Sequence, residues 1–231
     1  LSVALGFSAG VMLYVSFTEI LTKANAALNG IMSSGMARFT TTIAFFGGMA
    51  VVAMVDRLVP SAENPHEMHN VEELSAHERK HHKLMRMGIL SAIAIAIHNF
   101  PEGLATFIAA LKSPTLGISI AIAIAIHNIP EGIAVSVPVY YATGSRKKAF
   151  LYSFLSGLAE PAGALIGYFL LLRYLNDAVF GIVFAVVAGI MVFISFDELL
   201  PAAEKYGEHH LTIYGLVGGM IVMAGSLLLF M

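Results

Sequence analysis

The chain has 231 residues, of which 58% are hydrophobic and only 12% are charged, and its mean hydropathy is +0.80. Because soluble domains carry about 25% charged residues, this composition indicates a membrane protein. The formal net charge of −2 argues against nucleic acid as a partner. The sequence has no cysteine, which excludes disulfides and thiolate metal sites.

Seven apolar stretches are each close to the ~20 residues with which a helix crosses a bilayer. They lack the strict alternation of a membrane β-barrel. The sequence therefore predicts an all-α, polytopic membrane protein with a single transmembrane domain over residues 1–231. The seven predicted spans are Leu1–Leu21, Thr41–Val59, Gly88–Leu111, Leu116–Tyr140, Phe150–Leu172, Ala178–Leu200 and Leu211–Met231.

The first and sixth spans share one pattern. Residues 9–21, AGVMLYVSFTEIL, align without gaps to residues 188–200, AGIMVFISFDELL, at an offset of 198 − 19 = 179. The two spans cross the membrane in opposite directions, as the inverted repeats of secondary transporters do; the alternative is two similar apolar helices. A symmetric 3+2+3 arrangement of eight helices predicts a further helix upstream of Leu1.

One long polar segment, residues 60–87, separates the second and third spans. It contains five of the nine histidines. Because His-rich tracts bind metal, metal capture or sensing is one interpretation, and a solvated, partly disordered loop is the other. Nine of the thirteen Lys and Arg residues lie on the same side of the membrane as this loop, which places the loop in the cytoplasm by the positive-inside rule.

The third and fourth spans each carry the motif His-Asn-x-Pro-Glu-Gly. The run IAIAIHNFPEG (93–103) returns as IAIAIHNIPEG (122–132), at an offset of 127 − 98 = 29 residues. On an α-helix the His and Glu of each motif lie one turn apart and project from one face, and the Asn can offer its amide oxygen to the same side. The six motif residues are His98, Asn99, Glu102, His127, Asn128 and Glu131.

These polar groups are predicted to meet near the bilayer centre. At ~1.5 Å per residue, His98 lies about 15 Å from the start of its span, and His127 lies about 15 Å from the opposite side of the membrane. Glu160, in the segment GLAEPAG of the fifth span, falls at about the same depth, ~15 Å in. An ionised group there costs roughly 2.5–3.5 kcal/mol, so such groups are usually paired and functional.

The three glutamates predicted near the bilayer centre, Glu102, Glu131 and Glu160, have no Lys or Arg at the same depth to balance their charge. This predicts divalent cations as their partners. One such ion leaves a charge of −1 and two leave +1, while protonation is the competing route to neutrality and links metal binding to pH. A single buried His has an ordinary interhelical hydrogen bond as its alternative role. Imidazole, amide and carboxylate ligands suit Zn²⁺, Fe²⁺ or Mn²⁺ better than Cu(I). Met12 can add a thioether, although a Met among apolar neighbours is more often packing.

At these residues the sequence resembles the ZIP (Zrt/Irt-like) family of divalent metal transporters, and most closely its bacterial ZupT-like branch. The paired HNxPEG motif, the GLAEP segment and the flanking spans carry the resemblance, which covers essentially the whole chain. It implies eight core transmembrane helices, a homodimer in the plasma or inner membrane, and uptake of Zn²⁺, with Fe²⁺, Mn²⁺ and Cd²⁺ tolerated, into the cytoplasm. Alternating access, with an elevator-type movement, is the mechanism proposed for the family.

The resemblance also implies a centre that binds two metal ions, with Glu102 and Glu131 bridging them and Met12 at a position where the family can offer a further ligand. One site would use His98, Glu102, His127 and Glu131. The other would use Asn99, Glu102, Asn128, Glu131 and Glu160.

Two other functions would use the same features. An intramembrane metal-dependent hydrolase is one, but an HExxH protease places its general base directly after the first His, where this chain has Asn99 and Asn128. A metal-sensing membrane protein with residues 60–87 as its receptor is the other. The sequence favours a transporter rather than an enzyme, with divalent metal ions and the lipid bilayer as its partners.

Overall fold

The computed structural model describes residues 2–58, 76–174, 176–205 and 209–229. Within these ranges the chain is almost entirely helical and contains no strand. Six helical segments there are long and apolar enough to cross a membrane, and the stretch Ile95–Leu111 is a shorter apolar helix. The predicted class, a polytopic all-α membrane protein, is confirmed.

The helices occur in the following order along the chain. They are α1 (Ser2–Val15), the π-helical turn η1 (Ser16–Ile20), α2 (Leu21–Asn29), α3 (Ser34–Leu58), α4 (Ala76–Lys112), α5 (Pro114–Thr143), α6 (Arg146–Gly157), α7 (Ala159–Leu171), the 3₁₀ turn η2 (Leu172–Tyr174), α8 (Asp177–Ile194), the π-helical turn η3 (Ser195–Leu199), α9 (Leu200–Lys205) and α10 (His209–Leu229).

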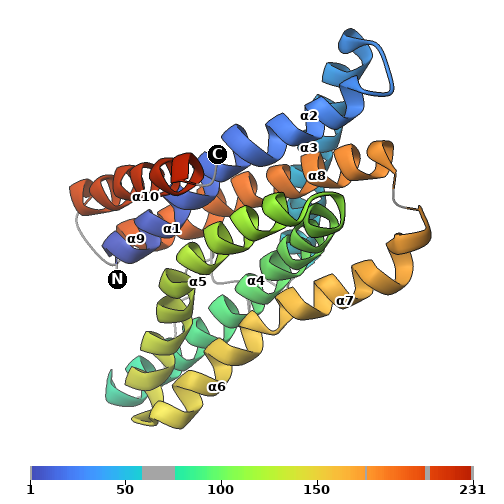
Figure 1. Ribbon diagram of the computed structural model, residues 1–231. Coiled ribbons are helices and arrows are strands. Elements are labelled where there is room, and N and C mark those ends of the chain that lie inside the picture. The colour runs from blue at the N-terminus through green and yellow to red at the C-terminus, as the bar shows by residue number, and fades with distance from the viewer. Residues whose placement is uncertain (1, 59–75, 175, 206–208, 230–231) are drawn as a thin grey trace.

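The helices pack as two units, which Figure 1 shows one above the other. In the repeat unit (α1–α3 and α8–α10), α1 packs along α10 and α3 packs along α8. In the motif unit (α4–α7), α4 packs against both α5 and α7, and α5 packs against α6. The units meet chiefly where α1 contacts α5 and where α8 contacts α4.

The repeat predicted between the first and sixth spans has a structural counterpart. Ser16–Ile20 and Ser195–Leu199 both form π-helical turns, and their first residues differ by 195 − 16 = 179, the offset of the sequence repeat. π-Helical turns are rare within α-helices. A shared departure from α-helical geometry at aligned positions supports a true repeat over two similar apolar helices.

Glycine contacts within the repeat unit follow the same relation. A Cβ at Gly10 of α1 would overlap the carbonyl oxygen of Leu216 in α10, and a Cβ at Gly189 of α8 would overlap the carbonyl oxygen of Phe45 in α3. Gly10 and Gly189 are also 179 residues apart. Small residues let membrane helices approach this closely, so α1 with α10 and α8 with α3 form two equivalent close-packed pairs.

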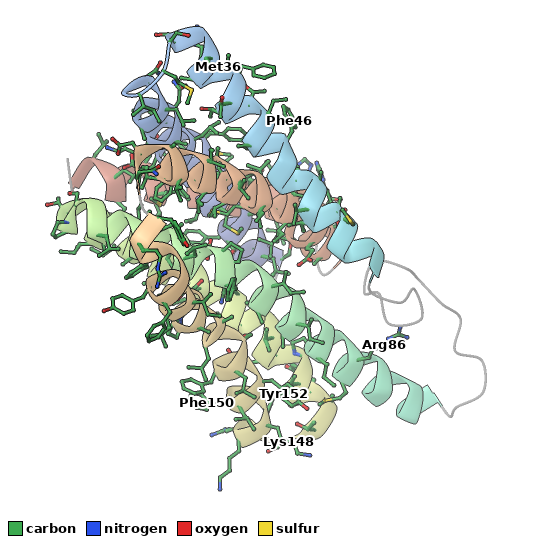
Figure 2. The ribbon with its side chains drawn as sticks, turned by 90° about the vertical axis from the view of Figure 1, so that its right-hand side faces the viewer. Met36, Phe46, Arg86, Lys148, Phe150 and Tyr152 are labelled. Carbon is green, nitrogen blue, oxygen red and sulfur yellow. The ribbon has the colours of Figure 1, made fainter. Side chains whose placement is uncertain are left out.

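The outer faces of the helices carry large apolar side chains. Met36 and Phe46 project from α3, and Phe150 projects from α6 (Figure 2), with exposed fractions of 55%, 58% and 68%. Extensive exposed apolar surface marks a membrane or protein contact. In a chain of this hydropathy, it fits helices surrounded by hydrocarbon.

Helix α4 begins earlier than its predicted span. The predicted span begins at Gly88, whereas the helix begins at Ala76, so residues 76–87 of the predicted loop are helical. Hydropathy detects only the apolar part of a helix, and residues 76–87 are rich in the good helix formers Ala, Glu, Lys, Leu, Met and Arg. The remaining loop residues, 60–75, lie outside the described part of the chain.

The fifth predicted span is interrupted. Helix α6 ends at Gly157 and α7 begins at Ala159, which places the break close to Glu160. Pro161 lacks an N–H and therefore cannot bond to the Gly157 carbonyl one turn earlier. The proline thus accounts for a helix end beside one of the predicted metal ligands.

Candidate metal centre

Both predicted motifs lie within the motif unit, in the neighbouring helices α4 and α5. Asn99, Glu102 and Glu131 are buried, with exposed fractions of 2%, 1% and 1%. The backbones of His98 and His127 are helical, while their side chains lie outside the described part of the structure. Three of the six motif side chains are thus withdrawn from the surface.

Each motif asparagine uses its amide N–H₂ group to contact the α6–α7 segment. Asn99 Nδ2 donates to the Ser156 carbonyl oxygen at 3.4 Å, and Asn128 Nδ2 donates to Glu160 Oε1 at 2.9 Å. Neither amide Oδ1 receives a hydrogen bond from any described residue. A buried acceptor without a donor is costly, and an amide oxygen in that position suits a bound cation.

Glu160 reaches this layer because α4 and α7 pack backbone to backbone. A Cβ at Gly103 would overlap the Glu160 carbonyl oxygen, and a Cβ at Gly163 would overlap the Phe100 carbonyl oxygen. Asn128 then holds the Glu160 carboxylate from α5. These contacts join Glu160 to both motif helices.

Glu131 also contacts the repeat unit. Ser8 of α1, with an exposed fraction of 0%, donates its hydroxyl to Glu131 Oε1 at 3.0 Å. Ser8 was not among the predicted site residues. A lone serine in an apolar helix more often bonds its own backbone, so nothing in the sequence distinguishes this one.

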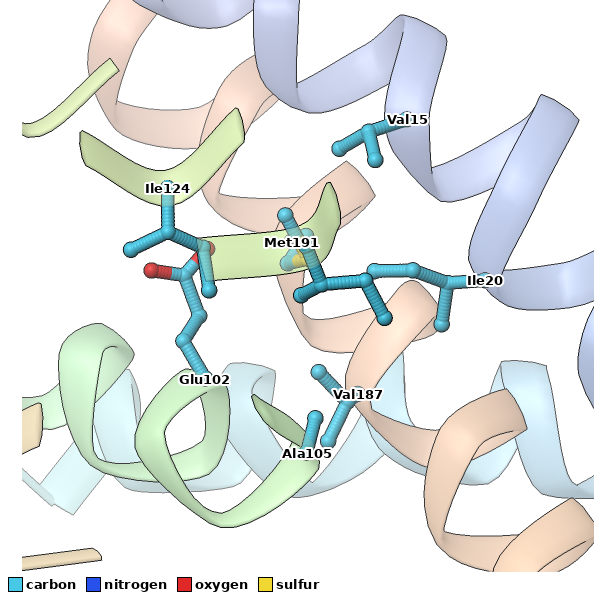
Figure 3. Close-up of a pocket in the computed structure, with 8 residues that line it drawn as sticks. Val15, Ile20, Glu102, Ala105, Ile124, Val187 and Met191 are labelled. Carbon is cyan, nitrogen blue, oxygen red and sulfur yellow. The ribbon is translucent and has the colours of Figure 1, made fainter. Parts of the chain in front are cut away.

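A small cavity lies beside Glu102 where the two units meet. The space open to the centre of a water-sized sphere is about 10 Å³, about enough for one water molecule. Figure 3 shows the Glu102 carboxylate extending from α4 toward Ile124. The lining residues are Val15, Ile20, Glu102, Ala105, Ile120, Ile124, Val187 and Met191. Glu102 is the one charged group among them and the other seven are apolar, so the cavity offers a water molecule fewer than the roughly two to four polar partners that buried waters usually have.

The remaining predicted ligand, Met12, is fully buried in the hydrophobic core. Its repeat partner Met191, rather than Met12, lines the cavity beside Glu102. Within the described ranges, no three His, Asp or Glu side chains form a group that could hold a metal ion. The side chains of His98 and His127 lie outside the described part of the structure, so the predicted ligand set stays a prediction.

The model of the ZIP zinc transporter family matches residues 1–227. The chain belongs to the ZIP family. Its relatives include proteins named "Zinc transporter ZupT" from Streptococcus mutans (62% identical), Chlorobium chlorochromatii (61%) and Chlorobaculum parvum (64%). These alignments cover 100% of this ZIP chain and 86%, 86% and 87% of the three relatives. The predicted resemblance is confirmed, and membership of a transporter family agrees with the prediction that the chain is not an enzyme.

Proposed function

We propose that this protein carries divalent transition-metal ions, Zn²⁺ foremost, across a membrane into the cytoplasm. The observation that carries the proposal is a pair of glutamates, Glu102 and Glu131, each only 1% exposed on neighbouring membrane helices. Carboxylates at such depth need partners, and a transported cation supplies one. Relatives that are 59–64% identical are named zinc transporters, which supports the choice of metal.

The site that we propose lies between α4, α5 and α7 and holds two ions. Glu102 and Glu131 bridge the ions, and each ion has a separate set of further ligands. His98 and His127 complete one site, while Asn99, Asn128 and Glu160 complete the other, and Met12 remains a candidate thioether ligand. The amide oxygens of Asn99 and Asn128, which receive no hydrogen bond from any described residue, support this assignment. The donor set favours Zn²⁺ and also accommodates Fe²⁺ and Mn²⁺, and we extend this tolerance to Cd²⁺.

The transport step that we propose is alternating access by movement of the motif unit against the repeat unit. Helix contacts within each unit are more extensive than those between the units, which favours movement of each as a body. The ligands of α4, α5 and α7 all belong to the motif unit and would move together. This is the elevator-type mechanism that the family resemblance implies.

We further infer that the protein forms a homodimer in the plasma or inner membrane, with residues 60–87 in the cytoplasm. The distribution of Lys and Arg supports this orientation, while the homodimer rests on the family resemblance.

Zinc uptake into proteoliposomes tests the function. Glu102→Ala and Glu131→Ala should each reduce uptake to the level of protein-free liposomes, because each removes a bridging ligand. Glu204→Ala is the matched control, since Glu204 is exposed at the end of the repeat unit, and it should transport normally. Undiminished uptake by both buried-site variants would overturn the proposal.

A further inference from the structure

We propose that Ser8 is a positioning residue that tethers the motif unit to the repeat unit through the Glu131 carboxylate. This tether would favour one of the two conformations between which the protein alternates. The inference rests on the proposed function, in which Glu131 binds the transported metal and the motif unit moves.

The contact joins a serine of one unit to a metal-binding residue of the other. Ser8 Oγ donates to Glu131 Oε1 at 3.0 Å, and the residues are 0% and 1% exposed. By contrast, the buried bond between Ser2 and Thr212, at 2.9 Å, links α1 to α10 and stays within the repeat unit. Movement of the motif unit must therefore break the first bond but not the second.

Burial makes the Ser8 bond strong enough to bias an equilibrium. Hydrogen bonds to an ionised group are about twice as strong as neutral ones, and low surrounding polarity strengthens them further. In the conformation that holds the bond, both groups are buried and no water competes for them. When the units move apart, both groups lose this partner. The conformation that keeps the bond is the one favoured.

The repeat places a different residue at the equivalent position of the other half. Ser8 maps onto Val187, since 187 − 8 = 179, and Glu131 maps onto Glu102, since 131 − 102 = 29. Correspondingly, α1 packs against α5 and α8 packs against α4. Val187 lines the small cavity beside Glu102, and a valine side chain cannot donate a hydrogen bond. The hydroxyl is thus present in one half and replaced by methyl groups in the other.

This asymmetry offers a second test of the tether. Val187 already lies beside Glu102 in the conformation that holds the Ser8 bond. A hydroxyl placed at Val187 would therefore add a second contact between the units in that same conformation. The two substitutions Ser8→Ala and Val187→Ser should thus shift the equilibrium in opposite directions.

Distance measurements between spin labels test the tether in lipid nanodiscs without metal. The sequence has no cysteine, so cysteines can replace Arg38 in α3 and Lys148 in α6, which are exposed residues of different units. Ser8→Ala should change the ratio of the two distance populations by about tenfold, the size expected for one hydrogen bond to a charged group. Val187→Ser should move the ratio in the opposite direction, because it adds a hydroxyl beside Glu102 in the conformation that holds the Ser8 bond.

Ser2→Ala is the matched control, because it removes a buried serine hydroxyl from the same helix within one unit. It should leave the distance populations unchanged. An unchanged ratio in Ser8→Ala, or an equal change in Ser2→Ala, would overturn the tether. Since no metal is present, that failure is distinct from failure of the proposed function, which the uptake of the Glu102 and Glu131 variants decides.

Discussion

Replacing Gly103 by alanine tests whether the contact between α4 and α7 positions Glu160. The added Cβ would lie inside van der Waals contact of the carbonyl oxygen, carbonyl carbon and Cα of Glu160. These are backbone atoms, so they cannot rotate away and the helices must separate. Inserting a methyl group into a packed interior costs about 1–3 kcal/mol, while alanine gains about 1 kcal/mol over glycine inside a helix.

Gly47→Ala in α3 isolates the packing cost, because nothing lies within 4 Å of a Cβ at that position. Helix propensity cancels between the two variants, so Gly103→Ala should be about 1–3 kcal/mol less stable than Gly47→Ala. It should also bind Zn²⁺ more weakly, since Glu160 moves away from the motif helices. Thermal unfolding and titration calorimetry in detergent measure both effects. Equal stability and equal zinc affinity in the two variants would refute this reasoning.

Two other outcomes concern the site and the loop. Zinc affinity should fall as the pH is lowered from neutral, because carboxylate and imidazole ligands bind metal only after losing their protons; calorimetric titrations that show no pH dependence would contradict a His and Glu site. Deleting residues 63–82 should leave a basal rate of zinc uptake in proteoliposomes, since the deletion removes only the first turns of α4 and the proposed ligands of that helix begin at His98. Complete loss of uptake by a correctly folded deletion variant would instead favour a role for the loop in metal reception.

Much of the fold could be predicted because hydropathy and motif spacing report directly on membrane helices. The paired HNxPEG motif identified α4 and α5, and the repeat at offset 179 predicted the relation between α1 and α8. The boundaries of the helices could be predicted less well than their existence. The charged start of α4 at Ala76 is favoured by helix propensity, whereas hydropathy detects only the apolar part of the helix.

Side-chain partners in the site could not be predicted from spacing. Ser8 contacts Glu131 across 123 residues of sequence, and only the packing of α1 on α5 brings them together. Gly103 was part of a predicted motif, yet its role against Glu160 depends on the position of α7. The twin π-helical turns were also not predicted, because hydropathy and motif spacing do not distinguish a π-helical turn from an α-helical one.

Anomalous X-ray scattering at the zinc edge, from crystals of the protein grown with zinc, tests the proposed centre most directly. The account predicts two peaks between α4, α5 and α7, with Glu102 and Glu131 close to both. No anomalous density in that layer, or density confined to residues 60–87, would contradict it.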